Sequence, residues 1–215
     1  MEEKKIRTYW EHEDFAKPYQ MGPQKHRIYI LDKLRELGVV TLLDLGCGTG
    51  PIYDLIINPV TESRWDNIHK YKGTDYSWRM IDTAKELFPY GKFEVQDARK
   101  MLEPDNSWDC VLLMHVLDHL DDYSAAISEA VRVSKKYICI CLWRSFVNGG
   151  TNLNPRNMYG KKEGEEPWED TFLQEYSRST LIMEFDKYNL IDVDIAEGPE
   201  ISDEGKFNFI WILKK

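Results

Sequence analysis

The feature that most constrains this chain is a glycine-rich stretch directly after an apolar run. Residues 39–45, VVTLLDL, form that run and include β-branched residues, which predicts a strand buried on both faces. Gly46, Gly48 and Gly50 follow at alternate positions, and Pro51 comes next. Glycine is costly in a folded chain unless the backbone turns sharply or approaches a ligand closely. The stretch therefore predicts a strand, a tight turn against a ligand, and a helix that begins at Pro51.

The apolar pattern along the chain indicates alternating strands and helices. We expect helices over residues 26–38, 51–57, 77–88, 121–136 and 177–189, and strands over 39–45, 71–75, 92–97, 109–115, 137–143, 190–198 and 206–215. Such alternation predicts right-handed crossovers, a parallel sheet and helices on both faces. The last two strands have no helix between them, so they should form an antiparallel hairpin. The expected fold is an α/β, Rossmann-like three-layer sandwich with a seven-stranded, mostly parallel sheet and an antiparallel C-terminal hairpin strand.

Local signals mark where several of these helices start and stop. Gly38 is a good C-terminal stop, and Ser77 is a good N-terminal cap. Asn189 can take the left-handed stop usually given to glycine. The helix expected over 121–136 has acids in its first turn and lysines in its last, which matches the helix dipole.

Composition bounds the class of protein and its partners. The 215 residues fit a single domain, 1–215, elaborated by an N-terminal segment, 1–38, and an insertion, 145–172. The formal net charge of −9 argues against nucleic acid as the main partner and favours a neutral or cationic ligand. No apolar run reaches the roughly eighteen residues that span a membrane, and the charged N-terminus is unlike a secretory signal. We therefore expect a cytoplasmic protein with reduced cysteines, and the oligomeric state stays open.

The glycine spacing discriminates between ligand classes. A dinucleotide-binding loop has the pattern G-x-G-x-x-G, whereas this loop reads G-x-G-x-G with proline in the next position. A phosphate-binding P-loop needs a lysine followed by serine or threonine after the glycines, and none is present. The spacing therefore favours a nucleoside ligand that lacks a pyrophosphate.

Several motifs together resemble one known family, the class I S-adenosylmethionine (SAM)-dependent methyltransferases. The stretch 42–50, LLDLGCGTG, is similar to the family's first motif, and 108–120, WDCVLLMHVLDHL, is similar to its fourth. Residues 176–195 resemble its last helix and sixth strand, with Asn189 and Leu190 where a Gly-Phe pair is usual. The resemblance covers residues 40–215 in the order of elements.

The resemblance implies a cofactor site at the carboxyl ends of the strands. Asp75 looks like the acid that binds the two ribose hydroxyls, and Asp97 looks like the acid near the adenine amino group. The alternative is that each aspartate merely caps a strand end. The residues expected to bind SAM, or its product S-adenosylhomocysteine (SAH), are Asp44, Gly46, Cys47, Gly48, Gly50, Asp75, Tyr76, Asp97, Ala98, Met114 and His115.

Two histidines follow the fourth strand and are candidates for catalysis. Methyl transfer is an in-line displacement that positioning alone accelerates, but a base helps when the acceptor must lose a proton. His115 and His119 are the candidate bases, and the alternative for His119 is packing under the sheet edge. With Asp118, Asp121 and Asp122 they also resemble a metal-binding set. The helix dipole already explains acids at a helix start, so we expect no metal.

Aromatic residues in the two elaborations are candidates for binding the methyl acceptor. Loops on such scaffolds often carry function, and aromatic side chains there can form a pocket that excludes water or stack on a planar substrate. The alternative is that they simply cover the sheet. The candidates are Tyr9, Trp10, Tyr19, His26, Arg144, Phe146 and Tyr159, with Asn148 and Trp168 nearby.

The leading functional prediction is a SAM-dependent methyltransferase that acts on a small molecule. RNA or protein side chains are alternative acceptors, and a basic strip around Arg144, Arg156, Lys161 and Lys162 would favour RNA. A nicotinamide dehydrogenase fits the glycine spacing and Pro51 poorly. A non-catalytic SAM-binding module is a further alternative, because methyl transfer has no obligatory catalytic group.

Overall fold

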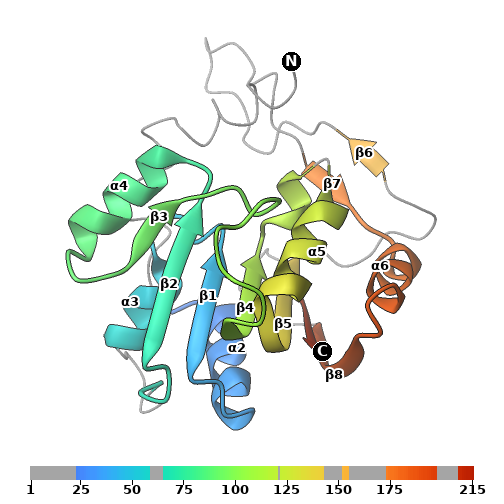
Figure 1. The fold of residues 1–215 in the computed structure, drawn as a ribbon, viewed down its shortest axis with the longest axis horizontal. Coiled ribbons are helices and arrows are strands. Elements are labelled where there is room, and N and C mark those ends of the chain that lie inside the picture. The colour runs from blue at the N-terminus through green and yellow to red at the C-terminus, as the bar shows by residue number, and fades with distance from the viewer. Residues whose placement is uncertain (1–22, 59–64, 121, 143–151, 155–172, 198–207) are drawn as a thin grey trace.

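The computed structural model describes residues 23–58, 65–120, 122–142, 152–154, 173–197 and 208–215. One seven-stranded sheet dominates it, with the strand order β3-β2-β1-β4-β5-β9-β8 (Figure 1). Its strands are β1 (Thr41–Leu45), β2 (Lys70–Asp75), β3 (Phe93–Val95), β4 (Trp108–Met114), β5 (Ser134–Leu142), β8 (Ile191–Glu197) and β9 (Phe209–Lys214). Strands β1 to β5 pair in parallel, whereas β9 runs antiparallel to both β5 and β8. This confirms the predicted fold class and the C-terminal hairpin.

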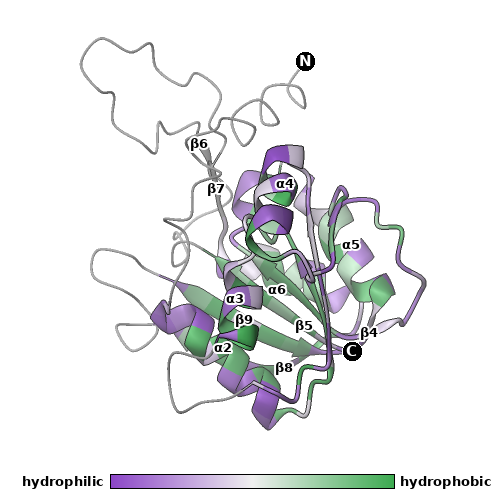
Figure 2. Cartoon of the chain, turned by 90° about the vertical axis from the view of Figure 1, so that its left-hand side faces the viewer, coloured by the Kyte–Doolittle hydropathy of each residue, from purple (hydrophilic) through white to green (hydrophobic). Residues whose placement is uncertain are grey.

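Helices cover both faces of the sheet, as the alternation predicts. They are α2 (Lys25–Glu36), α3 (Pro51–Ile57), α4 (Trp78–Leu87), α5 (Tyr123–Val133) and α6 (Arg178–Asp186). Buried residues of α2, α3 and α4 join one apolar cluster with one face of the sheet, and those of α5 and α6 join a second cluster with the other face. Figure 2 shows the apolar strands lying between the two layers of helices. The sheet is therefore buried on both faces. In such folds ligands bind beyond the carboxyl ends of the strands.

Helix ends mostly follow the predicted signals. Gly38 has a φ of 67° and donates to the carbonyl of Arg35, while Val39 donates to that of Leu34, which is the Schellman arrangement. The Ser77 side chain accepts from the backbone of Met80, and Asn189 takes a left-handed φ of 54°. These local choices agree with the tertiary fold.

The helix predicted over 121–136 is too long at its end. Helix α5 stops at Val133, and β5 begins at Ser134, so Lys135 and Lys136 belong to a strand and not to the last helical turn. Pairing of Ser134 with Trp108 of β4 explains the difference, because strand pairing with β4 already begins there. The helix-dipole argument therefore does not apply to those lysines.

Three small elements are absent from the expectations. Leu117–His119 forms a 3₁₀ turn, η2, directly after β4. Strands β6 (Asn152–Asn154) and β7 (Leu173–Glu175) pair antiparallel and bring the two ends of the segment between them together. Among the described residues, no helix has the length and apolar character needed to cross a membrane.

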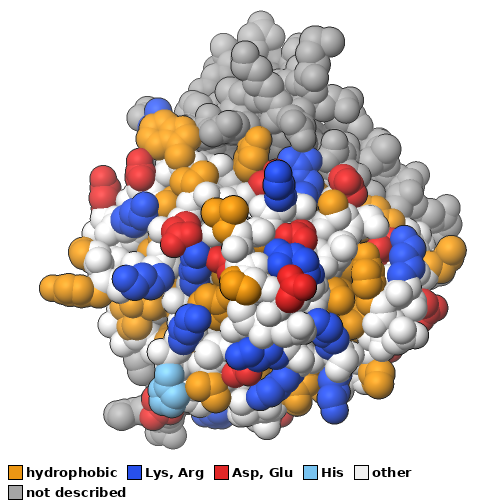
Figure 3. Space-filling view, in the orientation of Figure 1, with side chains coloured by type: hydrophobic (Ala, Val, Ile, Leu, Met, Phe, Trp, Pro, Cys, Tyr) orange, Lys and Arg blue, Asp and Glu red, His pale blue; other side chains and the backbone are white. Residues whose placement is uncertain are grey.

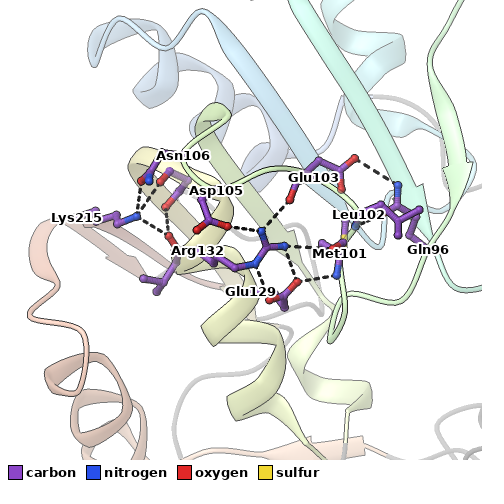
Figure 4. Close-up of polar contacts among 11 residues, drawn as sticks. Gln96, Met101, Leu102, Glu103, Asp105, Asn106, Glu129, Arg132 and Lys215 are labelled. Carbon is purple, nitrogen blue, oxygen red and sulfur yellow. Dashed lines mark hydrogen bonds and ion pairs between the residues drawn. The ribbon is translucent and has the colours of Figure 1, made fainter.

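The connection from β3 to β4 is held in place by one arginine. Arg132 of α5 donates to the backbone carbonyls of Met101 and Glu103, and its guanidinium pairs with Glu129 and Asp105 (Figure 4). Glu129 in turn accepts from the backbone of Met101 at 2.7 Å. This network fixes the loop that follows Asp97, one of the predicted cofactor residues.

Candidate functional site

The glycine loop leaves β1 at the carboxyl edge of the parallel strands. Gly46 has a φ of 72° and donates its N–H to the carbonyl of Thr74 at 2.7 Å, so the turn is fastened to the end of β2. A side chain at position 46 would overlap Val116, in the turn that follows β4. Gly50, with a φ of 89°, ends the loop, and Pro51 opens α3. Both the positive φ and the close approach therefore require glycine at position 46.

Asp75 ties the glycine loop to the end of β2. Its Oδ2 accepts from the backbone N–H of Gly48 at 2.9 Å, and its Oδ1 accepts from that of Ser77 at 2.9 Å. Burial raises the pKa of Asp75 despite these hydrogen bonds. The backbone of Tyr76 also donates to this carboxylate. A carboxylate offers about four lone-pair positions, so these backbone donors leave room for a further donor such as a ribose hydroxyl.

Asp44 is a fully buried acid on β1. Its Oδ2 accepts from the hydroxyl of Tyr71 at 2.7 Å, whereas its Oδ1 has no hydrogen-bond partner among the described residues. Burial raises the pKa of Asp44 to about 7, and the nearby Asp75 adds to that effect. Buried polar atoms are normally satisfied, so an unmatched carboxylate oxygen here indicates a place for a donor from outside the chain.

Asp97 follows β3 and is held by its own neighbour. The guanidinium and the backbone N–H of Arg99 both donate to its carboxylate, at distances between 2.8 and 3.2 Å. Partial burial acts to raise the pKa of Asp97, but the bonds from Arg99 outweigh it and keep that pKa below its usual value. Asp97 therefore stays ionised and fixed in orientation, which suits an acceptor for an amino group.

His115 stands at the end of β4 in an uncommon conformation. Its φ of 57° is left-handed, and its backbone N–H donates to the carbonyl of Cys141 at 2.8 Å. Its Nε2 lies 3.0 Å from Oδ1 of Asn208 and 3.4 Å from Sγ of Cys141. A left-handed conformation is uncommon outside glycine, although asparagine, aspartate and histidine adopt it more often than other residues, and such backbone strain clusters at functional positions.

His119 occupies a different setting from His115. It ends the 3₁₀ turn η2, is half-buried, and donates its backbone N–H to the carbonyl of Val116. Because His115 precedes the turn, the two histidines do not share a helix face. Within the described ranges, no group of three or more histidine, cysteine, aspartate or glutamate side chains is arranged to hold a metal ion.

Most predicted acceptor residues cannot be placed. Tyr9, Trp10, Tyr19, Arg144, Phe146 and Tyr159 lie outside the described residues, as do Asn148, Trp168 and the basic positions Arg156, Lys161 and Lys162. His26 is described, and it is 1% exposed on α2 with its ring 5.1 Å from that of His115.

Four supporting residues escaped the sequence analysis. Tyr71 partners Asp44, Arg99 holds Asp97, and Asn208 bridges to His115. Gly73 of β2 gives Cys47 of the loop room to pack, since a side chain there would come within 2.8 Å of the cysteine sulfur. Only Arg99 had a local signal, because it lies two positions after an aspartate. Tyr71, Gly73 and Asn208 contact residues that are distant in sequence, and the order of the strands in the sheet brings them together.

The remaining predicted cofactor residues line the same edge. Tyr76 and Ala98 follow β2 and β3 and are half-buried, while Cys47 and Met114 are buried beside the loop and at the end of β4. Hydrogen bonds and close packing join Asp44, the glycine loop, Asp75 and the turn after β4. Asp97 follows β3, the strand next to β2 at the same edge.

Comparison with known proteins identifies the domain. Residues 43–138 match the family model described as a methyltransferase domain. The matched segment, which is just under half of the chain, is a methyltransferase domain. The match includes the last three residues of β1, the glycine loop, Asp75, Asp97 and His115, so the resemblance read from the motifs is confirmed. The methyl donor of this family is SAM.

Curated relatives of the methyltransferase domain match part of the chain. A ubiquinone/menaquinone biosynthesis C-methyltransferase, UbiE, from Desulfotalea psychrophila is 31% identical over 123 residues, which is 55% of this chain and 47% of that protein. The chain spans less than half the length of the curated relatives it matches.

Solved structures share the fold of the methyltransferase domain across nearly the whole chain. Magnesium protoporphyrin IX methyltransferase from Synechocystis PCC 6803, solved with bound SAM, has a TM-score of 0.68 and 15% identity, covering 100% of this chain and 97% of its own. The [4+2]-cyclase SpnF has a TM-score of 0.61 and 18% identity, covering 87% and 80%. At these identities the likeness establishes the fold alone.

The residues present fit SAM as a ligand of this domain. SAM carries a sulfonium and an α-ammonium group, and an edge lined by Asp44, Asp75 and Asp97 is electrostatically suited to a cation. The unmatched Oδ1 of Asp44 is a buried acceptor that an ammonium group would satisfy. The G-x-G-x-G turn leaves the backbone open to close approach.

Proposed function

We propose that this protein is a SAM-dependent methyltransferase that moves a methyl group to an oxygen, nitrogen or carbon atom of a small molecule. The observation that carries the proposal is the buried carboxylate of Asp44, with one oxygen lacking a partner beside a glycine loop that is tied to Asp75. Burying an unsatisfied oxygen costs free energy, and a donor on a bound cofactor would remove that cost.

The proposed binding mode assigns each acid a part of the cofactor. Asp75 would accept the two ribose hydroxyls, with its orientation fixed by Gly48 and Ser77. Asp97 would accept from the adenine amino group beside Ala98, and Asp44 would accept from the ammonium group. The backbone of the loop from Gly46 to Gly50 would lie against the methionine part, with Cys47, Tyr76 and Met114 beside it.

The proposed chemistry is an in-line displacement that depends mostly on positioning. SAM supplies an activated methyl group on its sulfonium. An attacking lone pair on the acceptor forms the new bond to carbon, and the old bonding pair stays on sulfur. Any proton that the acceptor loses needs a base within hydrogen-bond reach. His115, at the end of β4, is the proposed base, and His119 is the second candidate.

Two observations support a small molecule as the acceptor. The relatives named above act, by their names, in ubiquinone and menaquinone biosynthesis and on magnesium protoporphyrin IX. Basic and acidic side chains are interspersed over the described part of the face in Figure 3, unlike the basic stripe of a typical nucleic-acid groove. The acceptor pocket is proposed to use the segments 1–38 and 145–172, and a cytoplasmic location is part of the same proposal.

Calorimetric titration of the purified chain with SAM, SAH and NAD tests the cofactor assignment. We expect saturable binding of SAM and SAH and none of NAD. Replacing Asp75 by alanine should weaken SAM binding by about 1.5–3 kcal/mol, because charge-assisted hydrogen bonds are lost. Asp82→Ala, on the exposed side of α4, is the matched control and should bind normally.

Absence of SAM and SAH binding by a folded protein would sink the proposal, and equal affinity in the Asp75 variant would remove the ribose assignment. Transfer of label from methyl-labelled SAM to a small-molecule extract then tests catalysis. Binding without transfer to small molecules, RNA or protein would favour a non-catalytic SAM-binding module. In such a module His115 would have no role as a base.

A further inference from the structure

Two histidines from distant parts of the chain meet one buried amide. Nδ2 of Asn208 lies 3.3 Å from Nδ1 of His26, and Oδ1 of the same amide lies 3.0 Å from Nε2 of His115. The imidazole rings are 5.1 Å apart. His26 comes from α2, His115 ends β4, and Asn208 immediately precedes β9. Asn208 and His26 are 3% and 1% exposed, so water does not compete freely for these contacts.

A carboxamide has one accepting end and one donating end. Whichever way it lies between two ring nitrogens, one of those nitrogens must carry a proton and the other must lack one. A histidine cation carries protons on both nitrogens, so two cations would place an N–H against the amide N–H₂. The bridge is therefore fully satisfied with one imidazolium at most.

We propose that Asn208 is a positioning residue that joins His26 and His115 into one proton-binding unit, which binds at most one proton beyond its neutral state and keeps Nε2 of His115 hydrogen-bonded to the amide. Proton exchange between His115 and a methyl acceptor then takes place at Nδ1. In that step the acceptor's lone pair bonds to the methyl carbon, the carbon–sulfur pair stays on sulfur, and the acceptor's proton goes to Nδ1. The sulfonium charge disappears as the imidazolium charge forms.

Other ionisable groups surround this unit. Cys141 of β5 lies 3.4 Å from Nε2 of His115, and burial raises the pKa of its thiol far enough to keep it protonated. Asp118 of η2 and Arg27 of α2 lie close enough to act on the same thiol with opposite sign. Among the described groups, the negative charge of Asp118 raises the pKa of the Cys141 thiol and the positive charge of Arg27 lowers it. The coupling between the two imidazoles is therefore attributed to the amide bridge.

The proton-binding unit itself does not depend on methyl transfer. Only the assignment of Nδ1 as the proton acceptor rests on the proposed function. The test therefore measures protonation directly, by long-range ¹H–¹⁵N NMR on the full chain labelled at histidine, with and without SAH. Variants His26→Gln and His115→Gln assign the signals, and the exposed His69 serves as internal reference.

In the wild type we expect Nε2 of His115 and Nδ1 of His26 to show opposite protonation at high pH. The second proton should bind at least roughly tenfold more weakly than the first, in two separate steps. Asn208→Leu should narrow that separation, leaving only the repulsion between the rings. Asn208→Asp should narrow it further, since a carboxylate accepts from both nitrogens.

Asn67→Leu is the matched control, because it deletes a part-buried amide that donates to Val39 on another edge of the fold. It should leave both histidine titrations unchanged. Equal protonation of the two facing nitrogens in the wild type would overturn the proposal. So would the same separation of steps in the wild type and in Asn208→Asp. The first of these results needs no variant of Asn208, so it stands even if Asn208→Leu fails to fold.

Discussion

At the residue scale, Asp44 carries a buried charge that the chain itself satisfies only in part. Burial raises its pKa from 3.8 to about 7, and among the described residues the hydroxyl of Tyr71 donates a hydrogen bond to it. The unfolded chain ionises this carboxyl at lower pH than the folded chain does. The stabilising contribution of the protonated form is therefore complete below about pH 4 and is lost as pH rises through about 7.

The first prediction compares Asp44→Asn with the wild type in urea unfolding at two pH values. Between about pH 5.5 and about pH 8, the wild type should lose on the order of 2 kcal/mol relative to the variant, because each unit of pKa difference corresponds to about 1.4 kcal/mol. A constant difference between the two proteins over this range would show that Asp44 is already ionised at low pH.

The same group predicts how cofactor binding depends on pH. An ammonium group pairs with the ionised form of Asp44, so SAH affinity should fall as pH drops below about 7. Calorimetry should detect this fall in the wild type, together with proton release on binding near pH 7. In Asp44→Asn, affinity should be at least roughly tenfold lower and flat with pH. A parallel decline in both proteins would point to a different titrating group.

At the element scale, the glycine loop depends on a neighbour that is distant in sequence. Gly46 and Gly38 have nearly the same φ, 72° and 67°, but only position 46 is crowded by another side chain, that of Val116. The two glycines therefore separate backbone strain from steric overlap. The turn after β4 therefore packs directly against the glycine loop.

The second prediction uses this pair. Gly38→Ala should cost about 1–2 kcal/mol of unfolding free energy from the left-handed backbone alone. Gly46→Ala should cost that plus about 1–3 kcal/mol for overlap with Val116, and it should impair SAH binding. Adding Val116→Ala should restore the overlap part only. Denaturant titration measures the unfolding free energy of the wild type, the two single variants and the double variant. Equal losses of unfolding free energy at positions 38 and 46 would show that the turn after β4 moves aside without cost.

At the scale of the whole molecule, charge distinguishes the two forms of the cofactor. The chain carries a formal net charge of −9, and three aspartates line the strand edge. SAM has one more positive charge than SAH, so long-range attraction should favour SAM, and salt should weaken that attraction.

The third prediction is a difference in salt dependence. Raising salt from about 50 mM to about 500 mM should weaken SAM binding by roughly threefold more than SAH binding, because screening shortens the reach of the net charge. Calorimetry at several salt concentrations measures both slopes, and SAH acts as the control with the same shape. Equal salt dependences of SAM and SAH affinity would mean that only local contacts, and not the net charge of the protein, distinguish the sulfonium.

Much of the fold and part of the site follow from short-range pattern. Apolar runs, glycine and proline punctuation and capping residues predicted the sheet, both helix layers and the C-terminal hairpin, because each depends on a few neighbouring residues. The same pattern misplaced the end of α5, where pairing of Ser134 with β4 ends the helix. The glycine loop and the position of Asp75 at a strand end were readable for the same local reason.

By itself, the sequence determined which residues can turn, cap, pair and ionise. Only the tertiary structure decided which of them meet: Tyr71 with Asp44, Val116 with Gly46, and Asn208 with both His26 and His115. Asn208 stands 93 residues from His115 and 182 from His26. Contacts at such separations arise from strand order and register, which no local spacing encodes.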